Sequence, residues 1–423
     1  MTRPTTLTAT TALAAVAALA LTGCSTPGAD GTEQVPGVTQ DTVTIGTHTP
    51  LTGAAAEAYA QISAATSAYF EYVNANGGIH GRSIDYIVKD DGYNPANTQT
   101  VTRELVSEDG IFAMVNGLGT PTHTTVLDYL DQNDVPDLFV ASGSAQWNQP
   151  EEYPNTFGMN VDYVTDGMVL ATHATEQDPE ATFCVLGQDD DYGGDVLAGV
   201  EAVVGADGVV ASETYNTSNP DLTAQIGAMK ESGCTHAVLA TIPGFTAIAM
   251  GTAAQLEWFP QYLVSNAGAD VESLAGYLGE EGAPLLEGML ATGYLPTGQD
   301  NEWYELFSQI NDEYNDGAPL TGTAIYGYSV GYHFAEALAL AGENPTRASL
   351  LEVMESGELV GNGVVPNSLS ADDHSPYHAA GITVVTGGEQ SYTGDAWARE
   401  GDTLSEIELE PKPVENEGIP TGE

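Results

Sequence analysis

The stretch IFAMVNGLGTPTHTTVLDYLDQNDVPDLFVASG, residues 111–143, contains the pattern that decides the fold. An apolar run over 111–115 leads into a glycine-rich turn, a helical pattern follows from Pro121, and a second apolar run covers 137–140. Strand, turn, helix and strand in this order predict two parallel strands joined by a crossover helix. The turn resembles a dinucleotide fingerprint, but Thr122 stands where the third glycine would be. The loop therefore suits one small polar or anionic head group better than a pyrophosphate.

The same alternation of strand and helix patterns covers most of the chain. Before residue 111, strand patterns at 42–48 and 83–91 alternate with helical patterns at 54–78 and 94–110. The cycle restarts near Tyr163 and continues to about residue 268. Three helical stretches at 302–314, 324–341 and 346–356 and a strand at 379–388 follow. We therefore expect an α/β fold of two doubly wound parallel-sheet lobes in series.

The first residues, MTRPTTLTATTALAAVAALALTGC, have the features of a secretory signal. The apolar part, 12–21, is shorter than the ~20 residues that a spanning helix needs. Its end, Leu21-Thr22-Gly23-Cys24, matches the bacterial lipoprotein cleavage pattern. We expect a signal peptide over 1–23, lipid on Cys24, a flexible spacer over 24–41 and anchoring at the extracellular face of the cell membrane. The alternative is an ordinary secretory peptide in which Cys24 is incidental.

The charge balance excludes one class of partner. The chain has 8 Lys and Arg against 60 Asp and Glu, a formal net charge of −52. Nucleic-acid binding needs a basic surface, which this composition cannot supply. Since 42% of the residues are hydrophobic, a core can still form and the acidic residues belong to the surface. A hydrated acidic shell of this kind predicts a salt-adapted protein. The acidic, proline-bearing segment 404–423 is expected to be disordered.

Two cysteines remain if Cys24 carries lipid. Cys184 and Cys234 each lie at the start of an apolar strand pattern. In an oxidising compartment they could form a disulfide if those strands are neighbours, and otherwise they are two small buried side chains. Two possible metal motifs are weak: Asp189-Asp190-Asp191 lacks the full calcium-loop pattern, and the pair His374 and His378 has no further ligands nearby in sequence. No metal or cofactor is predicted.

Four blocks together resemble a known family. They are VTIGTHTPLTG (43–53), FEYVNANGGIHGRSIDYIVKDDGYNPA (70–96), DDDYGG (189–194) and NPDLTAQIGAMKESG (219–233). In order and spacing they resemble the type I extracellular solute-binding proteins of ABC transporters, leucine/isoleucine/valine-binding branch. The resemblance covers roughly residues 42–390. It implies a monomer that closes on a small-molecule ligand and then meets the permease subunits of an ABC importer in the membrane.

The resemblance also implies how the chain divides. An N-terminal lobe would comprise 42–160 and about 291–365, and a C-terminal lobe 161–290 and about 366–395. Three crossings would join them, near Phe157–Asp162, Met289–Tyr294 and Gly363–Asn367.

Ligand contacts in the first lobe are expected in the loops after its strands. In the resembling family, the loop that aligns with Gly119 and Thr120 holds the ligand carboxylate. Free N–H groups at a helix start favour an anion, although Thr120 could also be a plain helix cap. The next strand end matches the second ligand loop of the family, carried here by Ala141, Ser142 and Gly143.

In the second lobe, Tyr192 aligns with an aromatic residue that lies over the ligand. Asn266 stands where amino-acid binders of the family usually have an acid that pairs with the ligand ammonium. Either another acid serves, with Glu57 as the candidate, or the ligand has no cationic amine. Amino acids, amides, ureas and carboxylic acids all remain open. Phe245, Tyr326 and Tyr328 are further candidates for the wall of the cleft, or ordinary core residues.

Two other functions have some support in the sequence. Residues 327–331, GYSVG, match the G-x-S-x-G pattern of serine esterases, with Asp372 or Asp373 and His374 or His378 downstream. Ser329, however, lies inside a helical pattern, whereas a nucleophile elbow needs a strand before it. The third possibility is a ligand-sensing module for a signalling partner, built from the same two lobes.

Overall fold

The computed structural model describes residues 35–298 and 301–422. The predicted signal peptide, Cys24 and residues 25–34 of the predicted spacer lie outside the described residues. Within the described part, no helix combines the length and the apolar character needed to cross a membrane.

The first sheet is fully parallel, with strand order β2-β1-β3-β4-β5. Its strands are β1 Thr42–Thr49, β2 Ser83–Asp90, β3 Met114–Val115, β4 Asp137–Val140 and β5 Thr156–Gly158. The β-branched and aromatic residues of these segments suit strands buried on both faces. The helix expected after β3 is broken into α3, Thr120–His123, and α4, Leu127–Gln132.

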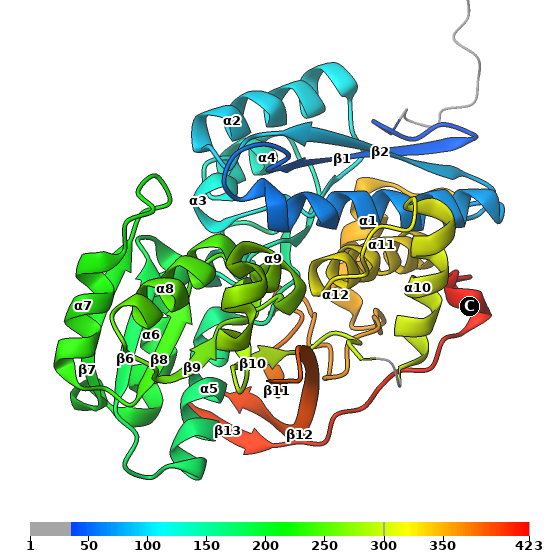
Figure 1. Ribbon diagram of the computed structural model, residues 1–423. Helices are drawn as coiled ribbons and strands as arrows, with labels where there is room; N and C mark the ends of the chain where they lie inside the picture. Colours follow the sequence, from blue (N-terminus) through cyan, green and yellow to red (C-terminus); the bar gives the residue numbers. More distant parts are fainter. Residues whose placement is uncertain (1–34, 299–300, 423) are drawn as a thin grey trace, which may run out of the picture. The chain divides into compact units, whose positions relative to one another are not determined.

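Helices from two parts of the chain pack on this sheet or on one another beside it (Figure 1). From the N-terminal part come α1 Ala56–Ala75, α2 Pro95–Glu104 and a π-helical turn at Leu105–Asp109; from the later part come α10 Glu302–Tyr314, α11 Gly322–Leu340 and α12 Arg347–Ser356. Helix α11 lies against α1 because Gly327 and Gly331 have no side chains. A Cβ on Gly327 would lie 2.2 Å from the Ile62 carbonyl oxygen, and one on Gly331 would lie 2.7 Å from Tyr69 Cδ1.

The second sheet begins with the same topology and continues differently. Strands β6 Phe183–Gln188, β7 Val209–Tyr215, β8 His236–Ala240, β9 Gln261–Val264 and β10 Leu290–Gly293 are parallel, in the order β7-β6-β8-β9-β10. Three antiparallel strands then extend the sheet from β10: β11 Ala379–Thr386, β12 Glu389–Glu400 and β13 Thr403–Glu406. The expected parallel sheet is therefore present, and the antiparallel strands β12 and β13 are an addition that was not predicted. Residues 389–406 include six charged residues and two glycines, so the alternation that is typical of a strand is weak.

The helices that pack with this second sheet are α5 Tyr163–Gln177, α6 Asp191–Val204, α7 Thr223–Ser232, α8 Pro243–Gln255 and α9 Val271–Gly282. We call the first sheet with α1–α4 and α10–α12 the first lobe. The second sheet with α5–α9 is called the second lobe. The boundaries predicted from the family resemblance remain a prediction.

Three connections between the lobes lie beside one another. Gly158 donates its N–H to the His374 carbonyl, and Asp162 donates to the Tyr377 carbonyl. Val364 donates to the Tyr294 carbonyl, 2.8 Å away. The expected crossings near Met289–Tyr294 and Gly363–Asn367 thus lie side by side, and the one near Phe157–Asp162 lies beside residues 374–377, further along the third connection.

The C-terminal segment differs from the expectation of a disordered tail. Residues 403–406 form β13, and the Glu410 N–H donates to the Val364 carbonyl. Further on, the buried Tyr69 donates its hydroxyl to the Gly418 carbonyl at 2.5 Å, and Tyr72 donates to the Glu417 carbonyl at 2.8 Å. These tyrosine donors on α1 hold a segment whose composition alone would predict no structure.

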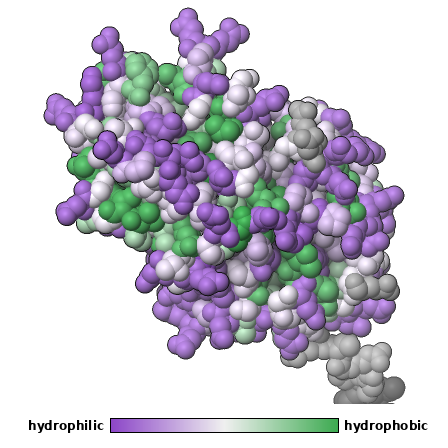
Figure 2. All heavy atoms as spheres, turned by 90° about the horizontal axis from the view of Figure 1, so that it is seen from below, coloured by the Kyte–Doolittle hydropathy of each residue, from purple (hydrophilic) through white to green (hydrophobic). Residues whose placement is uncertain are grey.

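The surface carries the acidic excess. Figure 2 shows one face, where hydrophilic side chains surround patches of hydrophobic ones. Among the described residues, the large hydrophobic side chains that are exposed are Leu51, Val210, Phe259 and Val360.

Candidate functional site

Both sheets begin with the same strand order, in which the second strand of each lobe lies outside the first and the third lies inside it. In such sheets the direction of winding changes between the first and third strands, and ligands bind beyond the carboxyl ends of the strands at that point. A cavity of about 140 Å³ lies there. Its lining includes residues that follow strands of both lobes: Gly119 and Thr120 after β3, Ala141 after β4, Tyr192 after β6, Ile242 after β8 and Asn266 after β9.

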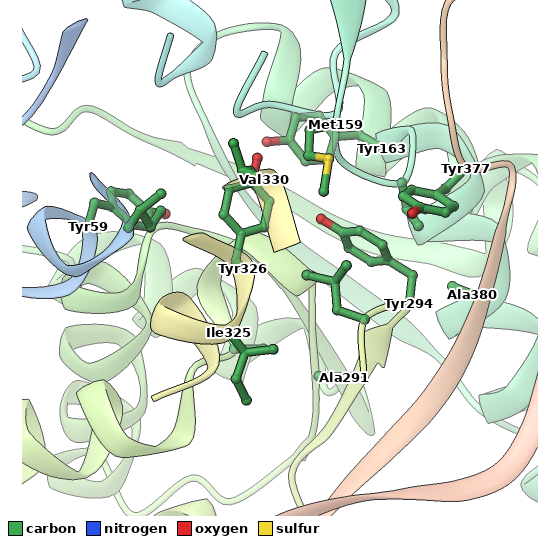
Figure 3. Close-up of a cluster of buried hydrophobic side chains, with 14 of the residues drawn as sticks. Tyr59, Met159, Tyr163, Ala291, Tyr294, Ile325, Tyr326, Val330, Tyr377 and Ala380 are labelled. Carbon is green, nitrogen blue, oxygen red and sulfur yellow. The ribbon is translucent and has the colours of Figure 1, made fainter. Parts of the chain in front are cut away.

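Seven tyrosines form much of the cavity wall: Tyr59, Tyr93, Tyr163, Tyr192, Tyr294, Tyr326 and Tyr392. They come from both lobes and from the connections between them. Figure 3 shows four of them, from α1, α5, α11 and the connection after β10, gathered with Met159. Phenol rings offer apolar faces and a hydroxyl tip, so the wall suits a ligand with an apolar body and a few polar atoms.

A group of hydroxyls marks one polar end of the cavity. Thr120 and Ser142 share a hydrogen bond of 2.7 Å between their hydroxyl oxygens. Tyr163 lies beside them, its N–H donating to the Gly143 carbonyl. Burial raises the pKa of Tyr163 to about 12, although the neighbouring Gly143 backbone and the Ser142 and Thr120 hydroxyls act in the opposite direction. The phenol stays protonated at neutral pH and can donate.

The loop that carries Thr120 is shaped by close contacts. Gly119 has φ of +102°, and a Cβ there would lie 2.5 Å from Thr122 Oγ1 and 2.6 Å from Tyr93 Cε2. Its N–H donates to the Ala141 carbonyl, so this N–H is not the free donor that we expected for an anion.

Four buried side chains form a hydrogen-bonded row that packs against the same loop. Asp91 Oδ2 lies 2.9 Å from His48 Nδ1, His48 Nε2 lies 2.8 Å from His123 Nδ1, and His123 Nε2 lies 2.7 Å from Asp137 Oδ2. Burial lowers the pKa of His48, and the hydrogen bond to Asp91 opposes this. A Cβ on Gly117 would lie 2.4 Å from His123 Nδ1. Sequence reasoning missed this network, because its members are 14 to 75 residues apart.

Asn266 is held by a buried acid in the second lobe. Its Nδ2 donates to Asp166 Oδ2 at 3.0 Å, and its Oδ1 accepts from Asn160 Nδ2 at 3.3 Å. The hydroxyls of Ser265 and Thr292 also donate to Asp166. Burial raises the pKa of Asp166 to about 6 despite these donors.

One acidic side chain lines the cavity within the described ranges. Asp270 Oδ1 accepts the Ser273 N–H at 2.8 Å, and Asp270 Oδ2 accepts the Thr323 N–H at 3.1 Å. Glu57, the acid that we expected to face the ligand, is exposed and does not line the cavity. It lies on α1, where its neighbour Tyr59 faces the cavity instead.

The comparison with family models gives a match over residues 42–390 to the periplasmic binding proteins. The chain belongs to this family. Because the match covers both lobes, the sites on the two sheets belong to one binding protein. A comparison with curated proteins gave no significant match.

Solved structures of this fold agree with the family. A fatty acid ABC transporter substrate-binding protein from Thermomonospora curvata is 21% identical, with a TM-score of 0.74 over 93% of this chain and 99% of its own. A branched-chain amino acid ABC transporter protein from Thermus thermophilus, with bound valine, is 18% identical, with a TM-score of 0.73 over 86% and 98%. A possible leucine/isoleucine/valine-binding protein from Rhodopirellula baltica is 19% identical, with a TM-score of 0.72 over 86% and 98%. At these identities the likeness shows the fold.

The structure brings some of the predicted site residues of the binding protein together and separates others. The cavity wall includes Gly119, Thr120, Ala141, Tyr192 and Asn266. Ser142 forms a hydrogen bond with the Thr120 hydroxyl, and Gly143 packs against Tyr163. Their roles in ligand binding remain predictions.

Two predicted aromatic residues lie elsewhere. Phe245 stacks on Tyr215 with 4.5 Å between ring centroids. Tyr328 faces Phe307 and donates its hydroxyl to Asn311 Oδ1 at 3.0 Å. Both are core residues. On α11 the cavity side is occupied by Tyr326, two residues earlier, because a helix turns by about 200° over two residues.

The serine of the esterase-like pattern lies in an unsuitable place. Ser329 is fully buried inside α11 and accepts a hydrogen bond from Asn362 Nδ2 at 3.2 Å. His374 contacts the Thr156 carbonyl, and His378 contacts Asp162 and Asp373. The two glycines of the pattern serve the packing of α11 on α1. This geometry is a helix contact rather than a nucleophile elbow. Over the described ranges, the structure contains no group of three or more His, Cys, Asp or Glu suited to a metal.

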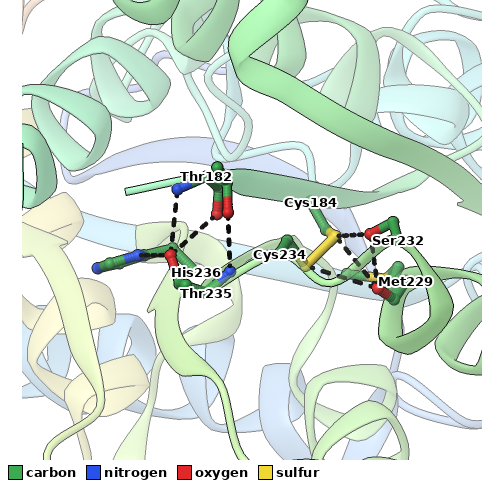
Figure 4. Close-up of a disulfide and its surroundings, with 7 residues drawn as sticks. All are labelled: Thr182, Cys184, Met229, Ser232, Cys234, Thr235 and His236. Carbon is green, nitrogen blue, oxygen red and sulfur yellow. Dashed lines mark hydrogen bonds between the residues drawn. A yellow bond between two sulfur atoms is a disulfide. The ribbon is translucent and has the colours of Figure 1, made fainter. Parts of the chain in front are cut away.

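The two remaining cysteines are joined. Cys184 on β6 and Cys234 just before β8 form a disulfide, with 5.8 Å between their Cα atoms (Figure 4). The two strands are neighbours in the second sheet, which is the arrangement that a bridge requires.

Proposed function

We propose that the chain is a lipid-anchored, extracellular solute-binding protein of an ABC importer. It captures a small polar ligand, such as an amino acid, amide, urea or carboxylic acid, by closing its two lobes around it. The observation that carries this proposal is the cavity, which is lined by residues of both lobes at the carboxyl ends of their strands.

Hydrogen bonds between the lobes on both sides of the cavity support closure as the binding step. Tyr59 donates its hydroxyl to the Ala267 carbonyl at 2.9 Å, and the Thr323 N–H donates to Asp270. On the other side, Gln146 Nε2 donates to Asp191 Oδ2 at 2.5 Å. These bonds can form only when the lobes are close together. A ligand that fills the cavity would therefore favour the conformation that a permease recognises.

The anchoring and the working environment are also part of the proposal. Lipid on Cys24 would hold the monomer near the permease subunits, and the charge of −52 suits concentrated salt. Labelling of cells with a radioactive fatty acid tests the anchor. We expect label on the wild-type protein and none on Cys24→Ser. Label retained on the variant would contradict lipidation at this residue.

A thermal-shift screen in high salt tests the binding function. Amino acids, amides, ureas and carboxylates are added to the purified protein, and a ligand at 100 times its dissociation constant should add about 2.7 kcal/mol of stability. We expect Thr120→Ala to reduce the shift of the best ligand. Thr100→Ala, on the exposed face of α2, is the matched control and should leave it unchanged. An unchanged shift in Thr120→Ala would mean that the site is misplaced.

The ligand-sensing module is the second candidate. It would use the same cavity and the same closure, so the ligand screen does not separate it from the importer. Binding of the closed protein to purified permease subunits does. A tight, ligand-dependent complex supports import, and ligand-dependent binding to a signalling receptor instead would support sensing.

A further inference from the structure

Tyr294 lines the cavity and has a hydroxyl without a partner. The residue begins the connection that leaves β10, and only 4% of it is exposed. Its hydroxyl is buried and makes no hydrogen bond to any described residue. Figure 3 shows the ring beside Tyr326, with the hydroxyl directed toward that side of the cluster.

Other tyrosine hydroxyls of the cavity wall are already satisfied by the protein. Tyr192 donates to the Thr241 carbonyl at 3.3 Å, Tyr326 to Asn160 Oδ1 at 2.9 Å, and Tyr392 to the Leu295 carbonyl at 2.8 Å. A buried hydroxyl without a partner costs free energy, and native proteins leave few of them. At the wall of a binding cavity, a ligand atom can supply the missing partner.

The charges around the cavity limit what that ligand can be. An ammonium group needs a carboxylate, but Asp270 already accepts two backbone N–H groups, and Asp166 accepts the donors of Ser265, Asn266 and Thr292. A carboxylate needs a cation or several free donors, and within the described ranges no Lys, Arg or His lines the cavity. A carboxylate would be buried beside Asp270 without a counter-ion, which is strongly unfavourable, and an ammonium group would have to compete with two backbone N–H donors for Asp270, the one acid in the described lining.

We infer that the cavity selects an uncharged small molecule with an apolar body, and that the Tyr294 hydroxyl hydrogen-bonds an oxygen of that molecule. This inference rests on the proposed binding function and names the class of its ligand. An amide fits: its carbonyl accepts from the hydroxyl of Tyr294 or of Thr120, and its apolar part packs against the tyrosine rings.

A set of compounds that differ only in charge tests the class. The binding protein is titrated in high salt with 4-methylpentanamide, 4-methylpentanoate, leucine and 3-methylbutylamine, which share one branched chain and are neutral, anionic, zwitterionic and cationic. Benzamide, benzoate, phenylalanine and benzylamine repeat the test with an aromatic body. We expect the neutral member of at least one series to bind at least tenfold more tightly than its charged relatives.

Tighter binding of any charged member than of its neutral relative overturns the inference. So does the absence of binding by both neutral members. If the wider screen nevertheless finds another ligand that depends on Thr120, the proposed function stands and only the ligand class fails. If the wider screen finds none, the proposed function fails as well.

Two tyrosine variants test the role of Tyr294. Tyr294→Phe should weaken binding of the neutral ligand about tenfold, because it removes one hydrogen bond, and should leave the melting temperature of the free protein unchanged or higher, because no bond is lost in the free state. Tyr392→Phe is the matched control, since its hydroxyl serves the Leu295 carbonyl. It should lower the melting temperature of the free protein. Unchanged affinity in Tyr294→Phe, or a loss of free-state stability equal to that of Tyr392→Phe, would show that the Tyr294 hydroxyl has a structural role only.

Discussion

Reduction of the Cys184–Cys234 disulfide should destabilise the second lobe. The bridge joins residues separated by 50 positions and closes a loop that contains all of α6, β7 and α7. In the chain-entropy model, a loop of this length restricts the unfolded chain enough to contribute about 4 kcal/mol to the free energy of unfolding. The same bridge places the beginnings of β6 and β8 side by side, where their parallel pairing starts.

The measurement compares oxidised protein, protein with reductant, and the variant Cys184→Ala/Cys234→Ala. Denaturant titration gives the free energy of unfolding, and hydrogen exchange at β6 and β8 shows whether the loss is local to the second lobe. We expect both reduction and the double variant to lower the free energy of unfolding by about 4 kcal/mol. Reductant added to the double variant is the control and should have no effect. A loss below about 1 kcal/mol on reduction would refute the entropic argument, since it would mean that the loop is already restricted in the unfolded chain.

Three further predictions follow from charge and packing. Burial alone would lower the pKa of His378, but hydrogen bonds to Asp162 and a second carboxylate raise it to about 9. Since this is above the unfolded value of ~6.5, the stabilisation is complete below pH 6.5 and is lost as the pH rises through 9. We expect the melting temperature to fall over this range in wild type and to change less in His378→Gln; parallel curves would contradict this. Gly117→Ala should cost about 1–3 kcal/mol by forcing a Cβ against His123, whereas Gly194→Ala, with open space around it, should cost nothing in the same thermal melt; equal melting temperatures would contradict the packing argument. Finally, molar salt should raise the melting temperature, because it screens a net charge of −52; an unchanged or lower value would contradict salt adaptation.

The fold was largely predictable because long elements have strong patterns. The helices expected at 302–314 and 346–356 correspond closely to α10, Glu302–Tyr314, and α12, Arg347–Ser356. Element β12 was missed because its alternation is weak: it contains Gly394 and several charged residues, although it pairs with β11, which directly precedes it in the chain. Local composition cannot reveal a strand that is stabilised mainly by its neighbour.

The candidate site was predictable only where it follows the strands. Predicted residues in the loops after β3, β4, β6 and β9 line the cavity, because parallel strands end at a common edge. Tyr59 and Tyr294 could not be found in this way, since a helix position or a crossing strand reaches the cavity only through the arrangement of the whole lobe. Glu57 was misplaced for the same reason: two residues along α1 change the direction of the side chain from the cavity to solvent.

The neighbours of Asn266 explain why an asparagine, rather than an acid, occupies this position. Asp166 lies directly behind it, fully buried, and Asn266 donates to it through both its backbone and its side chain. An aspartate at 266 would face Asp166 without a donor between them, and two adjacent buried carboxylates cannot both be ionised at low cost. The asparagine therefore satisfies the buried acid with N–H groups and presents an amide oxygen, rather than a charge, on the cavity side. This side of the cavity therefore offers an ammonium group no carboxylate at position 266 and leaves Asp270 as the acid in the described part of the wall. The matched series of neutral and charged compounds measures how strongly such a wall discriminates between them.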